Sequence, residues 1–396
     1  MVAMKRIRSF IAASLILVLL AGSVHAVTAN MSLKVENGQF GFWYCPYKDL
    51  ASSALSENMS PNTVLLMGSS EFRHGRSSRY HPMNMLAVNS VDILTIGGPG
   101  NQILFHTLAL GALEKNLHSR KAILLISPTW FRKNGVNCAS YGMRFSESEY
   151  LRFMENDRIS SGLKQYVADR SIRLLRKNSS FRSKVGLISR KLAYGESSVI
   201  TDLLFTTERF LALERDRITS SIAVNVVRKM PDVKLRDERI TPEQFKKAAK
   251  NAEMHSMSGS SNPFLMSDKS WWKKFFRHYE SGKIYQPNRM SKDSKEFGDL
   301  TAFLEVCRQT GIQAKLIIQP VNGRWFDFIG TEKKQRRETV DKIMKLADEY
   351  GAEAADLTTH EYEPYITKDA VHPWKKGWVL INKEIYDFCE ERSGKR

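Results

Sequence analysis

A short apolar run opens onto a glycine and two serines in Asn62-Thr-Val-Leu-Leu-Met-Gly-Ser-Ser-Glu71. A few apolar residues that end at a turn signal are typical of a strand buried on both faces of a sheet. The glycine at position 68 relaxes the steric demand of the turn that follows. We therefore predict a buried strand over residues 62–67, whose carboxyl end lifts the serines clear of the sheet edge.

The same pattern recurs along the chain and alternates with helical periodicity. Further strands are predicted at Val91–Ile96, Ala122–Ile126, Gln313–Ile318 and, more weakly, Glu353–Leu357, and helices at Ile103–Asn116, Ser294–Thr310, Glu332–Tyr350 and Trp374–Arg392. Strands that alternate with helices at this spacing indicate βαβ units and a parallel sheet, which is an α/β fold. Because ligands bind beyond the carboxyl ends of such strands, the loops after the first four strands should share one rim.

The first thirty residues have the pattern of a segment that enters a membrane. Basic residues within the first eight positions precede an uncharged stretch from Ser9 to Leu33, and residues 10–29 just reach the roughly 20 residues that a span requires. A basic flank before an apolar run is typical of a signal anchor or of a secretory signal, for which Val24-His25-Ala26 is a fair cleavage site. We favour the anchor. In either case, we expect the rest of the chain outside the cytoplasm.

Composition and charge limit the classes to which the chain can belong. Of its 396 residues, 42% are hydrophobic and 26% are charged, which excludes wholesale disorder, and the lack of a second long apolar run excludes a polytopic membrane protein. The 60 Lys and Arg outnumber the 42 Asp and Glu, and the resulting net charge of +18 indicates a polyanionic partner. Outside the cytoplasm, this partner is expected to be the membrane surface or a cell-wall polymer rather than nucleic acid.

Neither the cysteines nor the histidines predict a bound metal. The four cysteines are Cys45, Cys138, Cys307 and Cys389. They are too few for a disulfide scaffold, and the sequence leaves open which of them pair and which are free thiols. The spacings of His74, His81 and His106 match no ligand pattern, so we predict no metal site.

A basic segment interrupts the α/β pattern between the third and fourth predicted strands. Residues 151–200 contain eleven Lys or Arg against four Asp or Glu, with apolar residues at helical spacing. We predict four parts: a signal anchor at 1–30, the first part of the α/β domain at 31–145, a basic helical insertion at 146–292 and the second part of the α/β domain at 293–396. In the insertion, Lys269-Ser-Trp-Trp-Lys-Lys-Phe-Phe-Arg-His-Tyr279 suits a surface against lipid or polymer. We favour the alternative, a helix that buries its aromatic residues in the core.

The segments Gly68-Ser69-Ser70-Glu71 and Asp369-Ala-Val-His372 together have the residue types of a catalytic triad. A serine hydroxyl becomes a good nucleophile only when a base takes its proton. A carboxylate three residues before a histidine can accept a hydrogen bond from Nδ1 and stabilise the imidazolium. Each motif alone is weak, because Gly-Ser-Ser can simply cap a helix and the Asp-x-x-His segment can simply begin one. Their combination predicts nucleophilic catalysis.

Gly97-Gly98-Pro99-Gly100-Asn101-Gln102 follows the second predicted strand and could offer free N–H groups to an oxyanion. The spacing of its glycines does not match the dinucleotide-binding pattern. An ordinary turn between a strand and a helix explains the loop equally well.

Four motifs then resemble, in combination, the DltD family of teichoic acid D-alanylation, which is itself similar to the SGNH hydrolases. The motifs are Gly68-Ser-Ser-Glu71, Ser127-Pro-Thr-Trp-Phe131, Gln319-Pro-Val-Asn-Gly-Arg-Trp-Phe-Asp327 and Asp369-Ala-Val-His-Pro-Trp-Lys-Lys-Gly-Trp378. The resemblance covers nearly the whole chain. It implies an SGNH-hydrolase-like, doubly wound parallel sheet of the flavodoxin-like kind, with Ser70 as nucleophile, His372 as base and Asp369 as the residue that orients the base.

The same resemblance suggests residues around this triad. Gly100 and Asn101 are candidate oxyanion donors, although the chain lacks a clear Gly-x-Asn-Asp block. Asn322, Trp325 and Trp374 are candidates for substrate binding. The aromatic residues of the last two motifs could keep water from an acyl-serine or could simply pack in the core.

The function that the resemblance implies is that of a membrane-anchored, extracytoplasmic acyltransferase. D-Alanine would arrive as an activated ester from a membrane acyltransferase and a small D-alanyl donor subunit, and it would pass through Ser70 to a hydroxyl of teichoic acid. Exchange between two oxygen esters needs no cofactor, and the phosphates of the polymer suit a basic surface. Two alternatives stay open: a cell-wall carbohydrate O-acetyl esterase of the same fold, and a polyanion-binding scaffold without catalysis.

Overall fold

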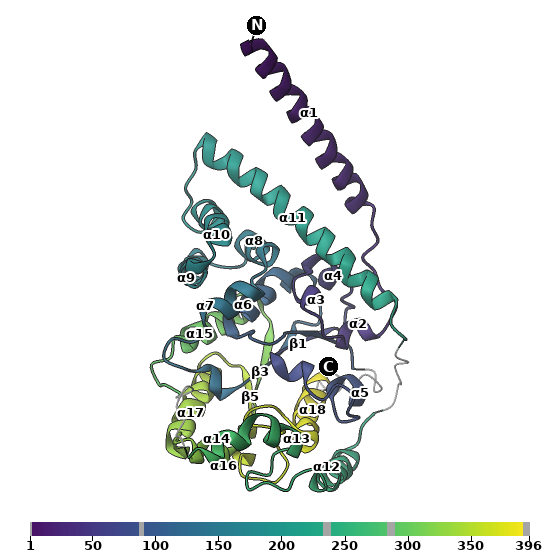
Figure 1. The fold of residues 1–396 in the computed structure, drawn as a ribbon, viewed down its shortest axis with the longest axis vertical. Helices are drawn as coiled ribbons and strands as arrows, with labels where there is room; N and C mark the ends of the chain where they lie inside the picture. Colours follow the sequence, from purple (N-terminus) through teal and green to yellow (C-terminus); the bar gives the residue numbers. More distant parts are fainter. Residues whose placement is uncertain (1, 87–90, 233–238, 283–289, 391–396) are drawn as a thin grey trace.

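The computed structural model describes residues 2–86, 91–232, 239–282 and 290–390, and its centre is a parallel sheet (Figure 1). The strands are β1 Val64–Met67, β2 Ile93–Ile96, β3 Lys121–Ile126, β4 Gln313–Ile318 and β5 Glu353–Asp356. They pair in parallel in the order β2-β1-β3-β4-β5, which is the flavodoxin-like order. The predicted α/β fold is confirmed, and each strand lies within two residues of its predicted bounds.

Helices surround this sheet and fill the long connection between β3 and β4. They are α1 Val2–Ala29, α2 Gln39–Phe42, α3 Pro46–Asp49, α4 Ser52–Glu57, α5 Pro82–Met85, α6 Ile103–Leu113, α7 Cys138–Arg144, α8 Glu147–Glu155, α9 Ser161–Leu174, α10 Ser179–Leu192, α11 Val199–Arg228, α12 Pro242–Met257, α13 Asp268–Ser270, α14 Phe276–Glu280, α15 Glu296–Thr310, α16 Gly323–Phe328, α17 Lys333–Glu349 and α18 Lys375–Glu390. The predicted helices correspond to α6, α15, α17 and α18. The last was expected to reach Arg392, which lies outside the described residues.

The two faces of the sheet are covered by different helices because successive strand side chains point to opposite sides. Leu65 and Leu124 belong to a large cluster with side chains of α6, α15 and α17. Leu66 and Ile123 belong to a second cluster with side chains of α12 and α18. The sheet is therefore the middle of three layers, and both ends of the α/β part meet on it.

The connection between β3 and β4 is helical, as the sequence predicts, and it shares the core of the sheet. Val167 of α9, Ile188 of α10 and Ala223 of α11 lie in the same buried cluster as Leu65 of β1. The domain boundaries predicted at 30, 145 and 292 stay predictions.

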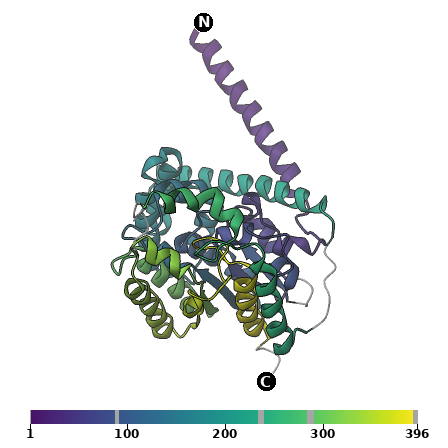
Figure 2. The same cartoon turned by 60° about the horizontal axis from the view of Figure 1, so that its bottom comes forward.

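The N-terminal helix stands apart from this body. In both views, α1 projects as a single rod beside α11, which lies across that end of the molecule (Figures 1 and 2). Its segment Arg6–Ala29 has 24 residues, and the most apolar 18-residue stretch in it has a mean hydropathy of 2.3, so the helix is long and apolar enough to cross a membrane. A cleaved signal has the same features, so the helix is consistent with either an anchor or a signal.

Candidate active site

Glycines hold the loops after β1 and β2 close together. Gly97 has a φ of 147°, and a Cβ there would lie 2.0 Å from the Gly68 carbonyl oxygen, so only glycine fits. The Ser69 hydroxyl is buried and donates to the Gly98 carbonyl oxygen at 3.2 Å. Ser69 therefore faces the β2 loop, which leaves Ser70 as the half-buried serine of this turn.

Ser70, His372 and Asp369 form a continuous chain of hydrogen bonds. Ser70 Oγ lies 2.8 Å from His372 Nε2, and His372 Nδ1 lies 2.9 Å from both carboxylate oxygens of Asp369. The His372 side chain is 15% exposed and that of Asp369 only 6%, so the base reaches solvent while its partner is covered. With the ring proton on Nδ1, Nε2 is free to accept the serine proton. The structure thus brings together the three residues that the sequence singles out.

Asp369 is charged at neutral pH, and its charge sets the tautomer of His372. Burial disfavours the charged carboxyl, but hydrogen bonds from the His372 ring and from the N–H groups of Val371 and His372 outweigh burial and hold the pKa of Asp369 well below its usual range. Because the carboxylate is charged at neutral pH, it keeps the ring proton on the Nδ1 side.

His74, whose position beside the base the sequence does not predict, stacks on His372. The rings of His74 and His372 have centroids 3.9 Å apart. Burial, and next the charge of His372, lowers the pKa of His74 to about 4. A neutral His74 can hold the plane of the base without repelling an imidazolium. No spacing rule marks it, because the contact joins two loops far apart in the chain.

Glu71 ties the Ser70 turn to the end of β4. Its Oε1 accepts hydrogen bonds from the Ser69 N–H at 2.7 Å and from Gln319 Nε2 at 3.2 Å. The carboxyl is buried, and burial raises its pKa. Glu71 of the Gly-Ser-Ser-Glu motif therefore stabilises the turn through buried hydrogen bonds and does not point toward the rim where a ligand would bind.

Asn322 joins the end of β4 to the loop that carries the acid and the base. Its Nδ2 donates to the Phe264 carbonyl oxygen at 2.8 Å and to Thr367 Oγ1 at 3.2 Å, and its Oδ1 accepts the Trp325 N–H at 3.0 Å. Its backbone N–H also donates to the Ala370 carbonyl oxygen, one residue past Asp369. These bonds favour a positioning role for Asn322 over the expected contact with substrate.

We therefore expect Asn322→Ala to lower stability and activity together. Loss of the amide leaves buried partners unsatisfied, which should reduce the free energy of unfolding by about 2 kcal/mol. The Asp369 loop should loosen, so labelling of Ser70 by a fluorophosphonate should slow. Thermal unfolding and labelling rates measure the two effects. An unchanged melting temperature with weakened acceptor binding would instead indicate direct contact with substrate.

The two oxyanion candidates suggested by the sequence, Gly100 and Asn101, make no described contact with Ser70. A Cβ on Gly100 would meet Ser140, and Asn101 is buried with both amide atoms unpaired among the described residues. Within the same described part of the chain, the Ser70 N–H has no acceptor, so it is a further donor for an oxyanion.

Most of the aromatic residues near this rim pack in the core. Trp325 and Phe326 lie in a buried cluster with Trp271, and Trp378 is buried against His81. The favoured core interpretation of the basic and aromatic segment thus accounts for its first tryptophan, whereas the next residue, Trp272, is 60% exposed. The candidate Trp374 is half-buried and contacts Tyr365, so it has the most open side chain of the four aromatic residues Trp325, Phe326, Trp374 and Trp378.

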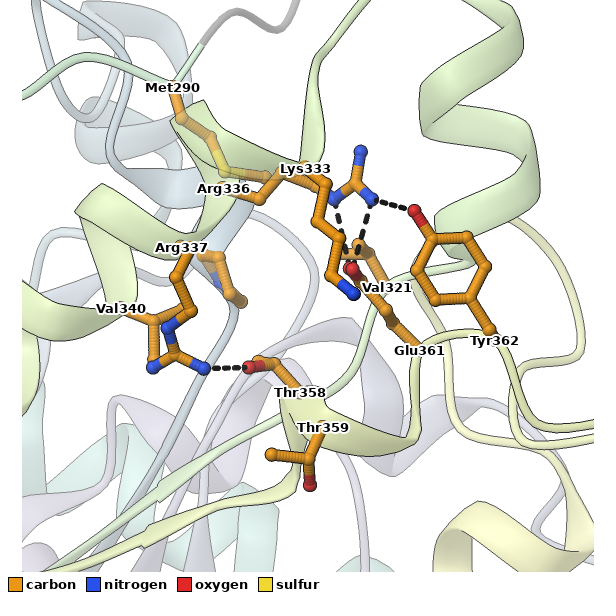
Figure 3. Close-up of a pocket in the computed structure, with 11 residues that line it drawn as sticks. Met290, Val321, Lys333, Arg336, Arg337, Val340, Thr358, Thr359, Glu361 and Tyr362 are labelled. Carbon is orange, nitrogen blue, oxygen red and sulfur yellow. Dashed lines mark hydrogen bonds and ion pairs between the residues drawn. The ribbon is translucent and has the colours of Figure 1, made fainter.

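A pocket of about 280 Å³ lies at the same rim, beyond β3, β4 and β5 (Figure 3). Its walls include Pro128, Val321 and Thr358, which follow these three strands. Figure 3 shows two arginines of α17 bonded across the pocket, Arg336 to Glu361 and Tyr362, and Arg337 to Thr358. Both arginines are engaged by residues of the pocket wall, so they stabilise that wall. The pocket itself is small and partly apolar.

A larger and more basic hollow of about 1010 Å³ lies between the β3 loop, α9 and α15. The cationic residues that line it are Arg170, Arg173, Arg176, Lys177, Lys292, Lys295 and Lys342. Arg170 is paired with Asp299, but Arg173, Arg176 and Lys177 are exposed and have no carboxylate partner among the described residues. Such a surface can hold a chain of phosphates.

The chain is similar to known proteins over most of its length. A family model described as DltD protein matches residues 44–390. Protein DltD of Bacillus subtilis (strain 168) is 27% identical over 333 residues, which cover 83% of this chain and 82% of that protein. Protein DltD of Staphylococcus aureus (strain NCTC 8325 / PS 47) is 24% identical over 81% of this chain and 79% of that protein. Protein DltD of Lacticaseibacillus rhamnosus is 23% identical over 85% of this chain and 79% of that protein.

Proposed function

Because the chain belongs to the DltD family, we propose that it acts in the D-alanylation of teichoic acid as a membrane-anchored, extracytoplasmic acyltransferase. The observation that carries the catalytic part is the hydrogen-bonded chain of Ser70, His372 and Asp369 at the carboxyl end of the sheet. The direct test is the D-alanine ester content of teichoic acid in cells that carry Ser70→Ala.

The proposed reaction has two balanced halves. Ser70 Oγ attacks the carbonyl carbon of an activated D-alanyl ester while His372 Nε2 takes the hydroxyl proton, and the proton then leaves with the departing group. A hydroxyl of the polymer next attacks the acyl-serine and gives its proton to the same nitrogen. Ser70 recovers that proton as the new ester leaves. The Ser70 N–H would stabilise both oxyanions.

The basic hollow gives this reaction an acceptor site. Poly(glycerol phosphate) and poly(ribitol phosphate) carry about one negative charge per unit, and seven cationic residues line the hollow. The hollow also adjoins the β2 loop, because a Cβ on Gly100 would lie 3.3 Å from Ser140 Cβ and the Ser140 N–H donates to Oδ1 of Asn137, which lines the hollow. A polymer held there would extend toward the loop that packs on Ser69.

Charge reversal at Arg173, Arg176 and Lys177 to Glu should weaken binding of poly(glycerol phosphate). If each reversal costs about 0.5–1 kcal/mol, the Kd rises about tenfold or more. Binding by the wild-type chain should also weaken steeply as salt rises, because salt screens exposed charges. Titration of the polymer at several salt concentrations measures both effects.

The matched control carries Lys246→Glu, Lys247→Glu and Lys250→Glu, which change net charge equally on exposed positions of α12. This control should bind almost as the wild type does. If both variants lose affinity equally, the polymer responds to overall charge and the hollow is not its site.

A further inference from the structure

Helix α11 exposes far more apolar surface than a solvated helix should. Its large apolar side chains that are between 40% and 87% exposed are Val199, Ile200, Leu203, Leu204, Phe210, Leu211, Ile218, Ile222 and Val226. Scattered apolar residues are common on protein surfaces, but a continuous patch of this kind marks an interaction site.

These side chains lie on one face of the helix. Ile200, Leu204, Leu211, Ile218 and Ile222 follow each other at intervals of four or seven residues, which keeps them in one stripe at 3.6 residues per turn. The side of α11 that packs on the body instead carries Ala212, Asp216, Ser220, Ala223 and Val227, all buried. The apolar stripe therefore faces away from the body.

The N-terminal helix leaves from the same face. Glu214 Oε1 lies 2.7 Å from His25 Nδ1, and its Oε2 accepts a hydrogen bond from Thr28 Oγ1, also at 2.7 Å. The His25 ring lies 5.7 Å from the ring of Phe210, a member of the stripe. Both views show α1 rising from the side of the molecule that α11 covers (Figures 1 and 2). The last turns of α1 thus fix the direction from which a membrane would approach.

We propose that the apolar face of α11 lies in the outer membrane interface, so that the protein touches the bilayer at a second place besides α1. This inference rests on the proposed membrane anchoring by α1. A bilayer that holds α1 comes close to Phe210 and Leu211, and an apolar helix face of this kind is typical of helices at that depth. The basic residues near this face, Arg215 and Arg217, are paired with Glu147 and Glu214, so the apolar side chains carry the contact. A single span lets the body rotate, whereas a second contact sets the orientation and height of Ser70 above the membrane.

The test uses the full chain in phospholipid vesicles that contain a tagged lipid. A photo-crosslinking amino acid is placed at Leu204 or Ile218 and, as a control, at exposed Lys250 of α12, on the side of the molecule remote from α11 (Figure 1). We expect several-fold more lipid adduct from the two α11 positions than from Lys250. Principal adducts with a second copy of the chain, or lipid labelling no greater than at Lys250, would overturn the proposal.

A charged variant separates this contact from the anchor. Leu203→Glu combined with Leu211→Glu should reduce lipid adducts from Leu204 several-fold without lowering the melting temperature, because both leucines are already exposed. The variant should still resist extraction by carbonate, which reports on α1. Extraction of the wild-type chain would reject the anchoring itself, while a retained chain without lipid adducts would reject only the role of α11. Ser70→Ala should label as the wild type does, so the outcome is independent of catalysis.

Discussion

Cells that carry Ser70→Ala are expected to show D-alanine esters on teichoic acid only at the level of cells without the protein. No other described hydroxyl bonds to His372 Nε2, so the variant has no nucleophile for the acyl intermediate. Loss of a nucleophile that acts as a unit with its base costs on the order of 10⁴-fold or more in rate. Hydrolysis of the esters from purified teichoic acid and quantification of D-alanine measure the effect.

Ser69→Ala is the matched control one residue away. The Ser69 hydroxyl donates to the Gly98 carbonyl oxygen and not to the base, so its loss should cost about 1 kcal/mol of stability and leave transfer intact. A fluorophosphonate should label the wild type and Ser69→Ala but not Ser70→Ala. If Ser70→Ala retains normal D-alanine esters, the acyl-serine mechanism is wrong and the scaffold alternative gains support. Hydrolysis of acetyl esters by the purified wild-type protein, without any transfer of D-alanine, would favour the esterase alternative.

The sheet was predictable because its signals are local. Each of the strands β1 to β4 is a mainly buried apolar run that ends at or next to a glycine, a serine or a proline, whereas β5, Glu353–Asp356, is only partly buried and gave a weaker signal. The helical patterns between these runs then predict that the strands are parallel. The pair of Asp369 and His372 was predictable for the same reason, since three residues separate them. The Gly-Ser-Ser turn could be added because the carboxyl ends of parallel strands meet at one rim, and the family resemblance then chose Ser70 over Ser69.

The remaining parts of the site depend on contacts between distant loops. His74 stacks on a residue almost 300 positions later, and Asn322 bonds to Phe264 and Thr367 on separate segments. No periodicity records such contacts. The aromatic residues of the Trp325 motif gave an ambiguous signal. A tryptophan that lines the site and a tryptophan that packs in the core below it have the same sequence pattern. The apolar stripe of α11 was hidden by its similarity to a core helix, and only exposure in the folded chain distinguishes the two.

Asp369→Asn should reduce transfer by about 10⁴-fold while the fold persists. Asparagine has almost the same shape, but its NH2 group would face Nδ1 of His372, where the carboxylate now accepts a hydrogen bond with an Nδ1–Oδ1 distance of 2.9 Å. The ring would then prefer the tautomer with its proton on Nε2, which faces Ser70 and cannot accept the serine proton. The rate of fluorophosphonate labelling measures the loss, and His372→Ala should be about as severe.

The same variant should change how stability depends on pH, and this separates a buried charge from a merely polar contact. A carboxyl whose pKa is lower in the folded than in the unfolded chain stabilises the fold above its unfolded pKa of about 4, and the stabilisation is lost as the pH falls toward the folded value. Asparagine does not titrate. The difference in unfolding free energy between the wild type and Asp369→Asn should therefore shrink as the pH is lowered from about 5 to about 3. A difference that stays constant over this range would mean that Asp369 is not held as a charged partner of His372, and the proposed orientation of the base would fail with it.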